Sequence, residues 1–195
     1  MTGPDVSDRR PRRQTVALFA IVCGAFLVAL WLGRANVLAD RASLAGSLVL
    51  SAGLLVLSWI DLDRFLLPDA LTRPLIVLGL AANVLLGGPV LWSVAGAVVG
   101  YGVIFGLNLY WRRFRGQEGI GLGDAKLLAA GGAWLGLFAL PFILLVASGS
   151  ALVLIGLLSL VSKSQWQQVY LPFGPALAFA IWLAWCLPQF VPHLA

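Results

Sequence analysis

Residues 43–60 read SLAGSLVLSAGLLVLSWI, and none of these side chains is charged. A run of this kind is close to the ~20 apolar residues that a helix needs to cross a bilayer. Asp61 follows the run directly. We therefore expect residues 43–60 to form a membrane-spanning helix with an acidic side chain at the membrane edge.

The rest of the chain has the same apolar character. It has 195 residues, of which 61% are hydrophobic and 11% are charged, and its mean hydropathy is +0.96. So few charged groups cannot cover the surface of a soluble domain of this size. We expect an all-α, polytopic membrane protein with about seven transmembrane helices, two of them short. The other six runs lie at 15–32, 74–86, 90–111, 125–140, 142–161 and 171–187.

The basic residues predict the orientation. With a cytoplasmic N-terminus, alternate loops place eleven of the thirteen Lys and Arg residues on the cytoplasmic side, and only Arg34 and Arg41 fall outside. This bias accounts for the pI of 9.9 without a nucleic-acid partner, since no basic face or arm is present. We expect a multi-pass protein of the inner (plasma) membrane, in contact with lipid and without a nucleic-acid partner.

We expect one membrane domain with short flanks. Residues 1–14 form a basic cytoplasmic tail, 15–42 the first transmembrane helix and an outer loop, 43–187 the main membrane domain, and 188–195 a short tail. The basic start and first apolar run also resemble a signal peptide, with cleavage near Ala39 as the alternative. The run is longer than a typical signal core, so an uncleaved first span is preferred.

The acidic residues indicate where chemistry can occur. Five of the eight acids lie in two segments on the predicted cytoplasmic side, residues 59–69 and 117–126. Asp61 directly follows one apolar run and Asp124 directly precedes another. Two carboxyls at one site can share a proton, and the ionised one can activate water. Asp61 and Asp124 are therefore the candidate catalytic pair.

Other hydrolytic systems do not fit the composition. The single histidine, His193, lies near the C-terminus on the opposite predicted side, which excludes Ser-His, Cys-His and His-rich zinc sites. Cys23 and Cys186 have no partner at metal-ligand spacing and are interpreted as packing residues. No metal and no cofactor is expected.

Glycines have two predicted uses. Gly119, Gly121 and Gly123 permit close approaches that let Asp124 point toward a neighbouring helix, or they form a flexible connector. Three pairs at four-residue spacing predict tight helix packing in lipid. These are Gly96 and Gly100, Gly102 and Gly106, and Gly132 and Gly136.

The two acidic segments together resemble the type IV prepilin peptidases, membrane aspartic proteases with a Gly-x-Gly-Asp motif. Asp61 precedes Leu-Pro-Asp69, and residues 118–128 read EGIGLGDAKLL, followed by Gly-Ala-Trp-Leu-Gly136 and a late Leu-Pro-Phe-Gly-Pro175. The resemblance implies that Asp61 and Asp124 are catalytic. It implies a prepilin or pseudopilin substrate whose short basic leader is cut on the cytoplasmic side, typically after a glycine.

Other residues of the two segments receive weaker assignments. Gly121, Gly123, Lys126 and Asp69 are expected to support the motif, and Asp63 and Glu118 to position the substrate. For Asp63 and Asp69 the simpler alternatives are a solvated helix end and a helix cap. Lys126 either extends toward the membrane surface or tunes the field at Asp124.

One departure from the family pattern and two alternatives remain. Many members carry a cytoplasmic methyltransferase domain, often with paired Cys-x-x-Cys motifs, between their first two helices. The present sequence has no such segment, so peptidase activity without methyl transfer is expected.

An inactive family member that assists pilus or secretion-system assembly is one alternative function. A small transporter is the other, although its acids would lie near the middle of spans.

Overall fold

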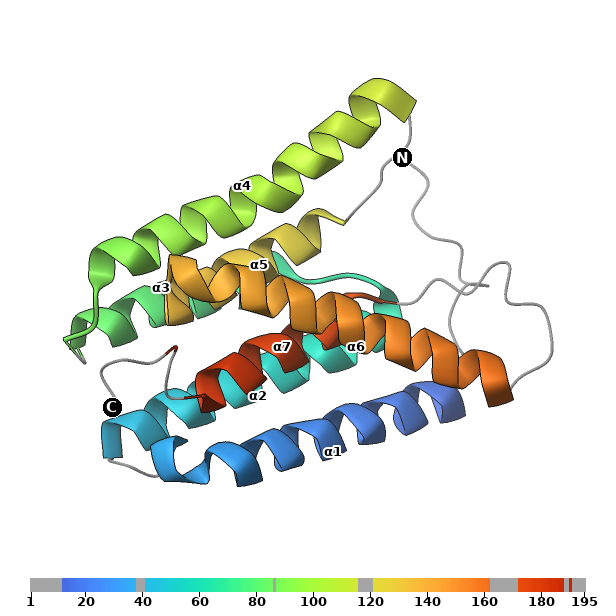
Figure 1. The fold of residues 1–195 in the computed structure, drawn as a ribbon, viewed down its shortest axis with the longest axis horizontal. Helices are drawn as coiled ribbons and strands as arrows, with labels where there is room; N and C mark the ends of the chain where they lie inside the picture. Colours follow the sequence, from blue (N-terminus) through green and yellow to red (C-terminus); the bar gives the residue numbers. More distant parts are fainter. Residues whose placement is uncertain are drawn as a thin grey trace.

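Seven α-helices account for most of the described chain. The computed structural model describes residues 12–37, 41–85, 87–115, 121–161, 172–187 and 190. Within these residues there is no strand, so the all-α class is confirmed. The helices run back and forth along one common direction (Figure 1). They are α1 (Arg12–Val37), α2 (Arg41–Arg64), α3 (Asp69–Leu85), α4 (Val90–Arg115), α5 (Leu122–Leu135), α6 (Leu140–Val161) and α7 (Gly174–Cys186), with a 3-10 turn, η2 (Leu137–Ala139).

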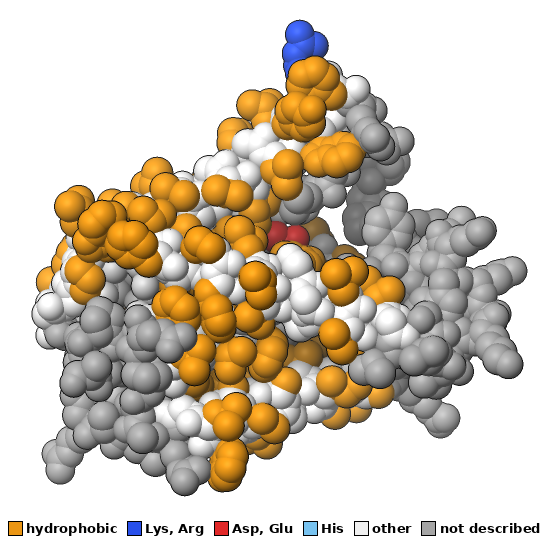
Figure 2. Space-filling model, in the orientation of Figure 1, with side chains coloured by type: hydrophobic (Ala, Val, Ile, Leu, Met, Phe, Trp, Pro, Cys, Tyr) orange, Lys and Arg blue, Asp and Glu red, His pale blue; other side chains and the backbone are white. Residues whose placement is uncertain are grey.

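Four of these helices are long and apolar enough to cross a membrane. The candidate spans are Thr15–Gly33, Ser43–Arg64, Val90–Phe114 and Leu137–Gly156, the last of which includes η2 with α6. Hydrophobic side chains cover much of the surface that Figure 2 shows, as lipid-facing helices require. The chain is therefore a multi-pass membrane protein.

The remaining three helices are short. α3 has 17 residues, α5 has 14 and α7 has 13. Two short helices were expected, and α7 is a third because it begins at Gly174 and ends at Cys186, inside the apolar run 171–187. Ten residues of α5 are buried, so protein rather than lipid surrounds this helix. At ~1.5 Å per residue it is about 21 Å long, less than the ~30 Å hydrocarbon core.

Two helix boundaries differ from the expectation near the acidic residues. α2 continues through Asp61 to Arg64, so Asp61 lies inside the last turn rather than after the helix. α3 begins at Asp69, five residues before Pro74, and includes that proline. An acidic residue in the first turn favours a helix start through the helix dipole, and the Leu71 and Thr72 N–H groups both donate to the Pro68 carbonyl, which begins the helix before the proline.

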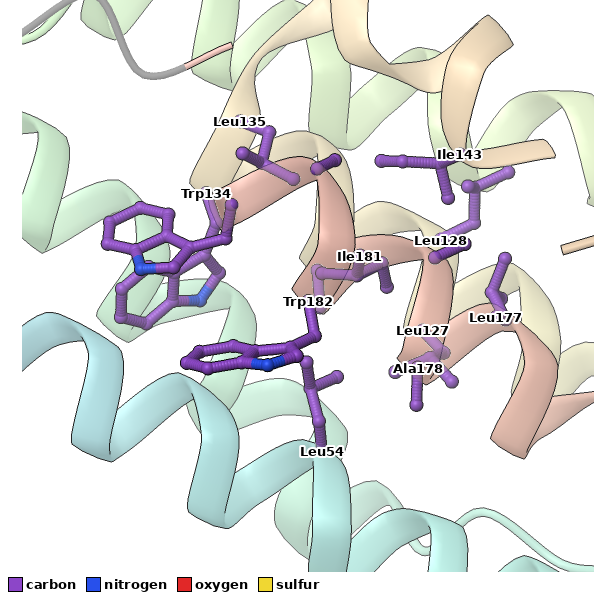
Figure 3. Close-up of a cluster of buried hydrophobic side chains, with 14 of the residues drawn as sticks. Leu54, Leu127, Leu128, Trp134, Leu135, Ile143, Leu177, Ala178, Ile181 and Trp182 are labelled. Atoms are coloured by element: carbon purple, nitrogen blue, oxygen red, sulfur yellow. The ribbon is translucent and has the colours of Figure 1, made fainter. Parts of the chain in front are cut away.

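Tryptophans join the central helices. Figure 3 shows Trp134 and Trp182 within the buried cluster that α5 and α7 share. The Trp134 indole N–H donates to the Leu75 carbonyl at 2.9 Å, and that of Trp182 donates to the Phe26 carbonyl at 3.0 Å. Each bond satisfies a buried donor and ties a central helix to a neighbour. This core fixes α5 and α7, which both begin at the end of the bundle where α2 stops (Figure 1).

Glycines allow α4 and α5 to touch through their backbones. A Cβ on Gly132 would lie 2.2 Å from the Gly96 carbonyl oxygen, and a Cβ on Gly100 would lie 2.9 Å from the Leu128 carbonyl oxygen. Side chains at these positions would therefore force the helices apart. The prediction of small-residue packing is confirmed for Gly96, Gly100 and Gly132.

The other predicted packing glycines behave differently. Among the residues that the structure describes, nothing lies within 4 Å of a Cβ placed on Gly102 or Gly106, so the packing prediction is wrong for this pair. Both residues are exposed, on the side of α4 that turns away from α5. Gly136 has φ of +81° and ends α5, and it also contacts α4, because a Cβ on Gly96 would lie 2.7 Å from the Gly136 carbonyl carbon.

Candidate active site

The candidate site lies where four helix ends meet. The end of α2 and the starts of α3, α5 and α7 are at the same end of the bundle (Figure 1). Figure 2 shows acidic side chains at the floor of a recess below α4. The structure thus gathers the acids of two separate sequence segments at one end of the bundle.

Asp61 is held at the start of α7. Its side chain is buried, with 5% exposed, and its Oδ2 accepts a hydrogen bond of 3.1 Å from the Gly174 N–H. Gly174 is the first residue of α7, whose N-cap residue, Phe173, makes no side-chain capping bond. The Asp61 carboxylate therefore takes the place of a cap, where free N–H groups and the helix dipole favour negative charge.

The close approach of Asp61 requires glycine at position 174. A Cβ on Gly174 would lie 2.4 Å from Asp61 Oδ2, well inside van der Waals contact. Pro175 follows in the first turn of α7, where a missing N–H costs no hydrogen bond. The Phe-Gly-Pro sequence thus builds a helix start that a carboxylate can approach.

Asp124 lies in the first turn of α5, outside the four candidate spans. Burial raises the pKa of Asp124 to about 7, and the negative charge of Asp61 adds to the rise. The second effect requires that the two carboxyls lie within electrostatic reach of each other. Because each opposes ionisation of the other, one proton shared between them is favoured.

The two described glycines before Asp124 have different requirements. A Cβ on Gly123 would lie 2.9 Å from the Leu67 Cβ, so glycine is needed for α5 to start against the turn between α2 and α3. A Cβ on Gly121 would lie 3.7 Å from Asp124 Oδ2, which is ordinary contact, and its φ is −63°. The expectation that a side chain is blocked therefore fails at Gly121. Gly119 and Glu118 lie outside the described residues.

Lys126 binds Asp69 rather than Asp124. The Lys126 ammonium and the Arg73 guanidinium both pair with Asp69, the latter at 2.8 Å. The hydrogen bond from Lys126, with smaller effects of both positive charges, lowers the pKa of Asp69 below its ordinary value. Since Asp69 opens α3 and Lys126 lies in the first turns of α5, this pair joins the two helix starts beside Asp124.

Asp63 takes no part in this network. Its carboxylate lies 3.8 Å from Arg64 Nε, and its side chain is 45% exposed. Such a loose and exposed pair contributes little to stability. Among the described residues, no group of three or more His, Cys, Asp or Glu side chains could hold a metal ion.

Residues 48–157 match the type IV leader peptidase family, and this range contains both Asp61 and Asp124. The chain belongs to this family. Three relatives are each named "Prepilin leader peptidase/N-methyltransferase". They are 48% identical over 141 residues in Aeromonas salmonicida (strain A449), 43% over 140 in Neisseria gonorrhoeae and 41% over 138 in Pseudomonas aeruginosa. These matches cover 70–71% of this chain, which spans about half the length of the relatives, 47% in each case. No solved structure shows a significant match.

The sequence pattern alone does not identify two residues of this family member, one on α7 and one on α4. Gly174 was seen only as part of a late motif, although a Gly-Pro pair at the start of an apolar run is a helix-start signal that could have identified it. Asn108 stands alone in an apolar run, and nothing in the sequence shows which way it faces, although the structure buries it.

Proposed function

We propose that this chain is a membrane aspartic endopeptidase that removes the basic leader from prepilin or pseudopilin precursors at the cytoplasmic face of the inner membrane. The observation that carries the proposal is the electrostatic pairing of Asp61 and Asp124, both within the range that matches the leader peptidase family. The names of the relatives supply the substrate class.

The environments of the two carboxyls suggest separate roles. Asp61 accepts the Gly174 N–H at the start of α7, an arrangement that suits an ionised carboxylate. The pKa of Asp124 is raised to about 7, which suits a carboxyl that carries the shared proton. Asp61 is therefore assigned as the general base and Asp124 as the general acid.

The proposed reaction needs only water and these two side chains. Asp61 takes a proton from water while the oxygen attacks the scissile carbonyl carbon, and Asp124 gives its proton to the carbonyl oxygen. The tetrahedral intermediate then collapses. Asp61 passes its proton to the leaving nitrogen, and one hydroxyl of the intermediate returns a proton to Asp124. The peptide bond is hydrolysed, and both carboxyls regain their starting states.

Substrate binding is assigned to two parts of the precursor. Its apolar helix would pack against the spans in lipid, and its basic leader would lie near the acids at the cytoplasmic end. Asp69 is already paired with Lys126 and Arg73, so Asp63, which is 45% exposed, is the more accessible acid for the leader.

The test is cleavage of a model prepilin by the purified protein in lipid nanodiscs, with the cut site read by mass spectrometry. Asp61→Asn and Asp124→Asn should each lower the rate by about 10²- to 10⁴-fold while leaving the protein folded. Asp63→Asn is the comparison variant and should lower the rate only mildly, because an exposed acid paired with the leader contributes about 1 kcal/mol or less. No cleavage by the unmodified protein, or full activity of either catalytic variant, would refute the proposal.

A further inference from the structure

Asn108 is a buried amide whose oxygen has no partner among the described residues. Its side chain lies on α4 with 5% exposed, and no donor in the described part of the chain bonds to its Oδ1. The buried Asn83 of α3 behaves in the opposite way, because its Nδ2 donates to the carbonyls of Gly79, Ala133 and Trp134 at 3.0–3.1 Å. A buried acceptor without a donor destabilises a fold, so its presence calls for an explanation.

The helix register places Asn108 beside the start of α5. Residues 96, 100, 104 and 108 are the buried positions along one side of α4, one turn apart. Gly96 contacts Gly132, and Gly100 contacts Leu128. The two helices are therefore antiparallel, and a step of four residues forward along α4 corresponds to a step of four residues back along α5. Eight further residues along α4 reach Asn108, and the same step back along α5 passes Asp124, which is level with Ile104, and ends just before the helix begins at Leu122. Asn108 therefore lies level with the start of α5, about one turn beyond Asp124.

The start of α5 also lacks a side-chain cap. Its N-cap residue, Gly121, has no side chain to accept a backbone N–H, although the Asp124 N–H bonds to the Gly121 carbonyl at 3.1 Å. Backbone donors at this helix start and the acceptor of Asn108 thus occur at the same level. An extended peptide offers both complementary groups, an N–H and a C=O, in each residue.

We infer that Asn108 is a substrate-positioning residue whose Oδ1 accepts a backbone N–H of the precursor next to the cleaved bond. This inference rests on the proposed peptidase function and adds to it a residue outside the aspartate pair. A backbone contact of this kind is independent of the substrate side chains. It would align any extended precursor segment with Asp124.

A first experiment separates this role from a structural one. Asn108→Leu keeps the side-chain size but removes an unpartnered polar atom, so the melting temperature in nanodiscs should stay equal or rise. At the same time kcat/KM for a model prepilin should fall roughly three- to tenfold, mainly through KM, as for the loss of one hydrogen bond. Asn83→Leu is the matched control and should lower the melting temperature. A destabilised Asn108→Leu protein, or one with unchanged kcat/KM, would overturn the inference.

A second experiment uses the unmodified protein. Model prepilins are made with an ester in place of one amide at each position flanking the cut, which deletes a single backbone N–H. One such ester substrate should bind the unmodified protein several-fold more weakly than the amide substrate does. The Asn108→Leu protein should bind that ester and the amide equally well. Equal losses in both proteins would show that Asn108 does not contact the substrate backbone. Absence of any cleavage by the unmodified protein would instead refute the peptidase function.

Discussion

The Gly174 N–H donates a hydrogen bond of 3.1 Å to Asp61 Oδ2 and so links two residues 113 positions apart in the chain. This bond connects the last turn of α2 with the first residue of α7. It satisfies one of the N–H groups that a helix start leaves free, and it fixes the direction of a buried carboxylate. The late Phe-Gly-Pro segment therefore belongs to the proposed catalytic machinery, although it carries no ionisable group.

Gly174→Ala should reduce cleavage strongly. The new methyl group would lie 2.4 Å from Asp61 Oδ2, so either the carboxylate or the start of α7 must move. Overpacking of this kind costs about 1–3 kcal/mol, and a displacement of a catalytic group by ~1 Å can cost about 10²-fold in rate. Gly149→Ala is the control, because no described residue lies within 4 Å of a Cβ there. Melting temperature and kcat are the measurements, and normal kcat in Gly174→Ala would contradict the assigned role of this contact.

Much of the fold follows from the hydrophobic pattern. Each of the seven apolar runs corresponds to a helix, because long uncharged stretches in lipid have no alternative that satisfies their backbone groups. Asp61 and Asp124 could also be predicted from the pattern, because each lies at the end of an apolar run. A carboxyl at the membrane edge needs a partner or a function. Helix limits shifted by up to five residues, as in α3, which starts at Asp69 although the apolar run begins only at Pro74.

The contacts between helices could not be predicted from the pattern. Lys126 pairs with Asp69 of α3 rather than with Asp124, which is only two residues away in the sequence. The packing of α3 against α5 determines this pairing. In the same way, four-residue spacing does not reveal which glycines face a neighbour. Gly100 meets α5, whereas Gly102 on the same helix points away from it. Such outcomes depend on how each helix is rotated about its axis.

The glycine contacts between α4 and α5 predict a large difference in stability between two glycine-to-alanine variants. Gly132→Ala should destabilise the protein by about 1–3 kcal/mol or more, because its methyl group would lie 2.2 Å from a backbone oxygen that cannot rotate away. Gly106→Ala should be neutral or slightly stabilising, because its position is open and alanine favours a helix. Unfolding in mixed micelles, followed by circular dichroism, measures both. Similar midpoints for the two variants would show that α4 and α5 do not pack as described.

The ion pair of Asp69 and Lys126 predicts a dependence of stability on acid. The pKa of Asp69 in the folded protein is below its ordinary value of 3.8, chiefly because Lys126 donates a hydrogen bond to it. The stabilisation is therefore complete above pH 3.8 and is lost as the pH falls through the lowered pKa. Asp69→Asn should melt at a lower temperature than the unmodified protein above that pH, and the difference should shrink below it. Added salt should also shrink it, since the pair is partly exposed. A difference that stays constant with both pH and salt would exclude an electrostatic origin.

The pKa of Asp124 predicts the alkaline side of the activity profile. In the proposed mechanism Asp124 must carry a proton, and its pKa is raised to about 7 by burial and by the charge of Asp61. The reactive form is therefore lost as the pH rises through about 7, and kcat/KM should fall close to tenfold for each further pH unit. On the acidic side activity should also decline, because protonation of both carboxyls leaves no base to activate water. The acidic and alkaline limbs of the profile belong to the coupled pair rather than to either residue alone.

The measurement is kcat/KM against pH for a model prepilin whose leader contains arginine as its only ionisable side chain, which keeps the substrate charge constant. Activity that persists unchanged well above pH 7 would show that no proton on Asp124 is required. The general-acid role would then have to be given up, even if both aspartates proved essential.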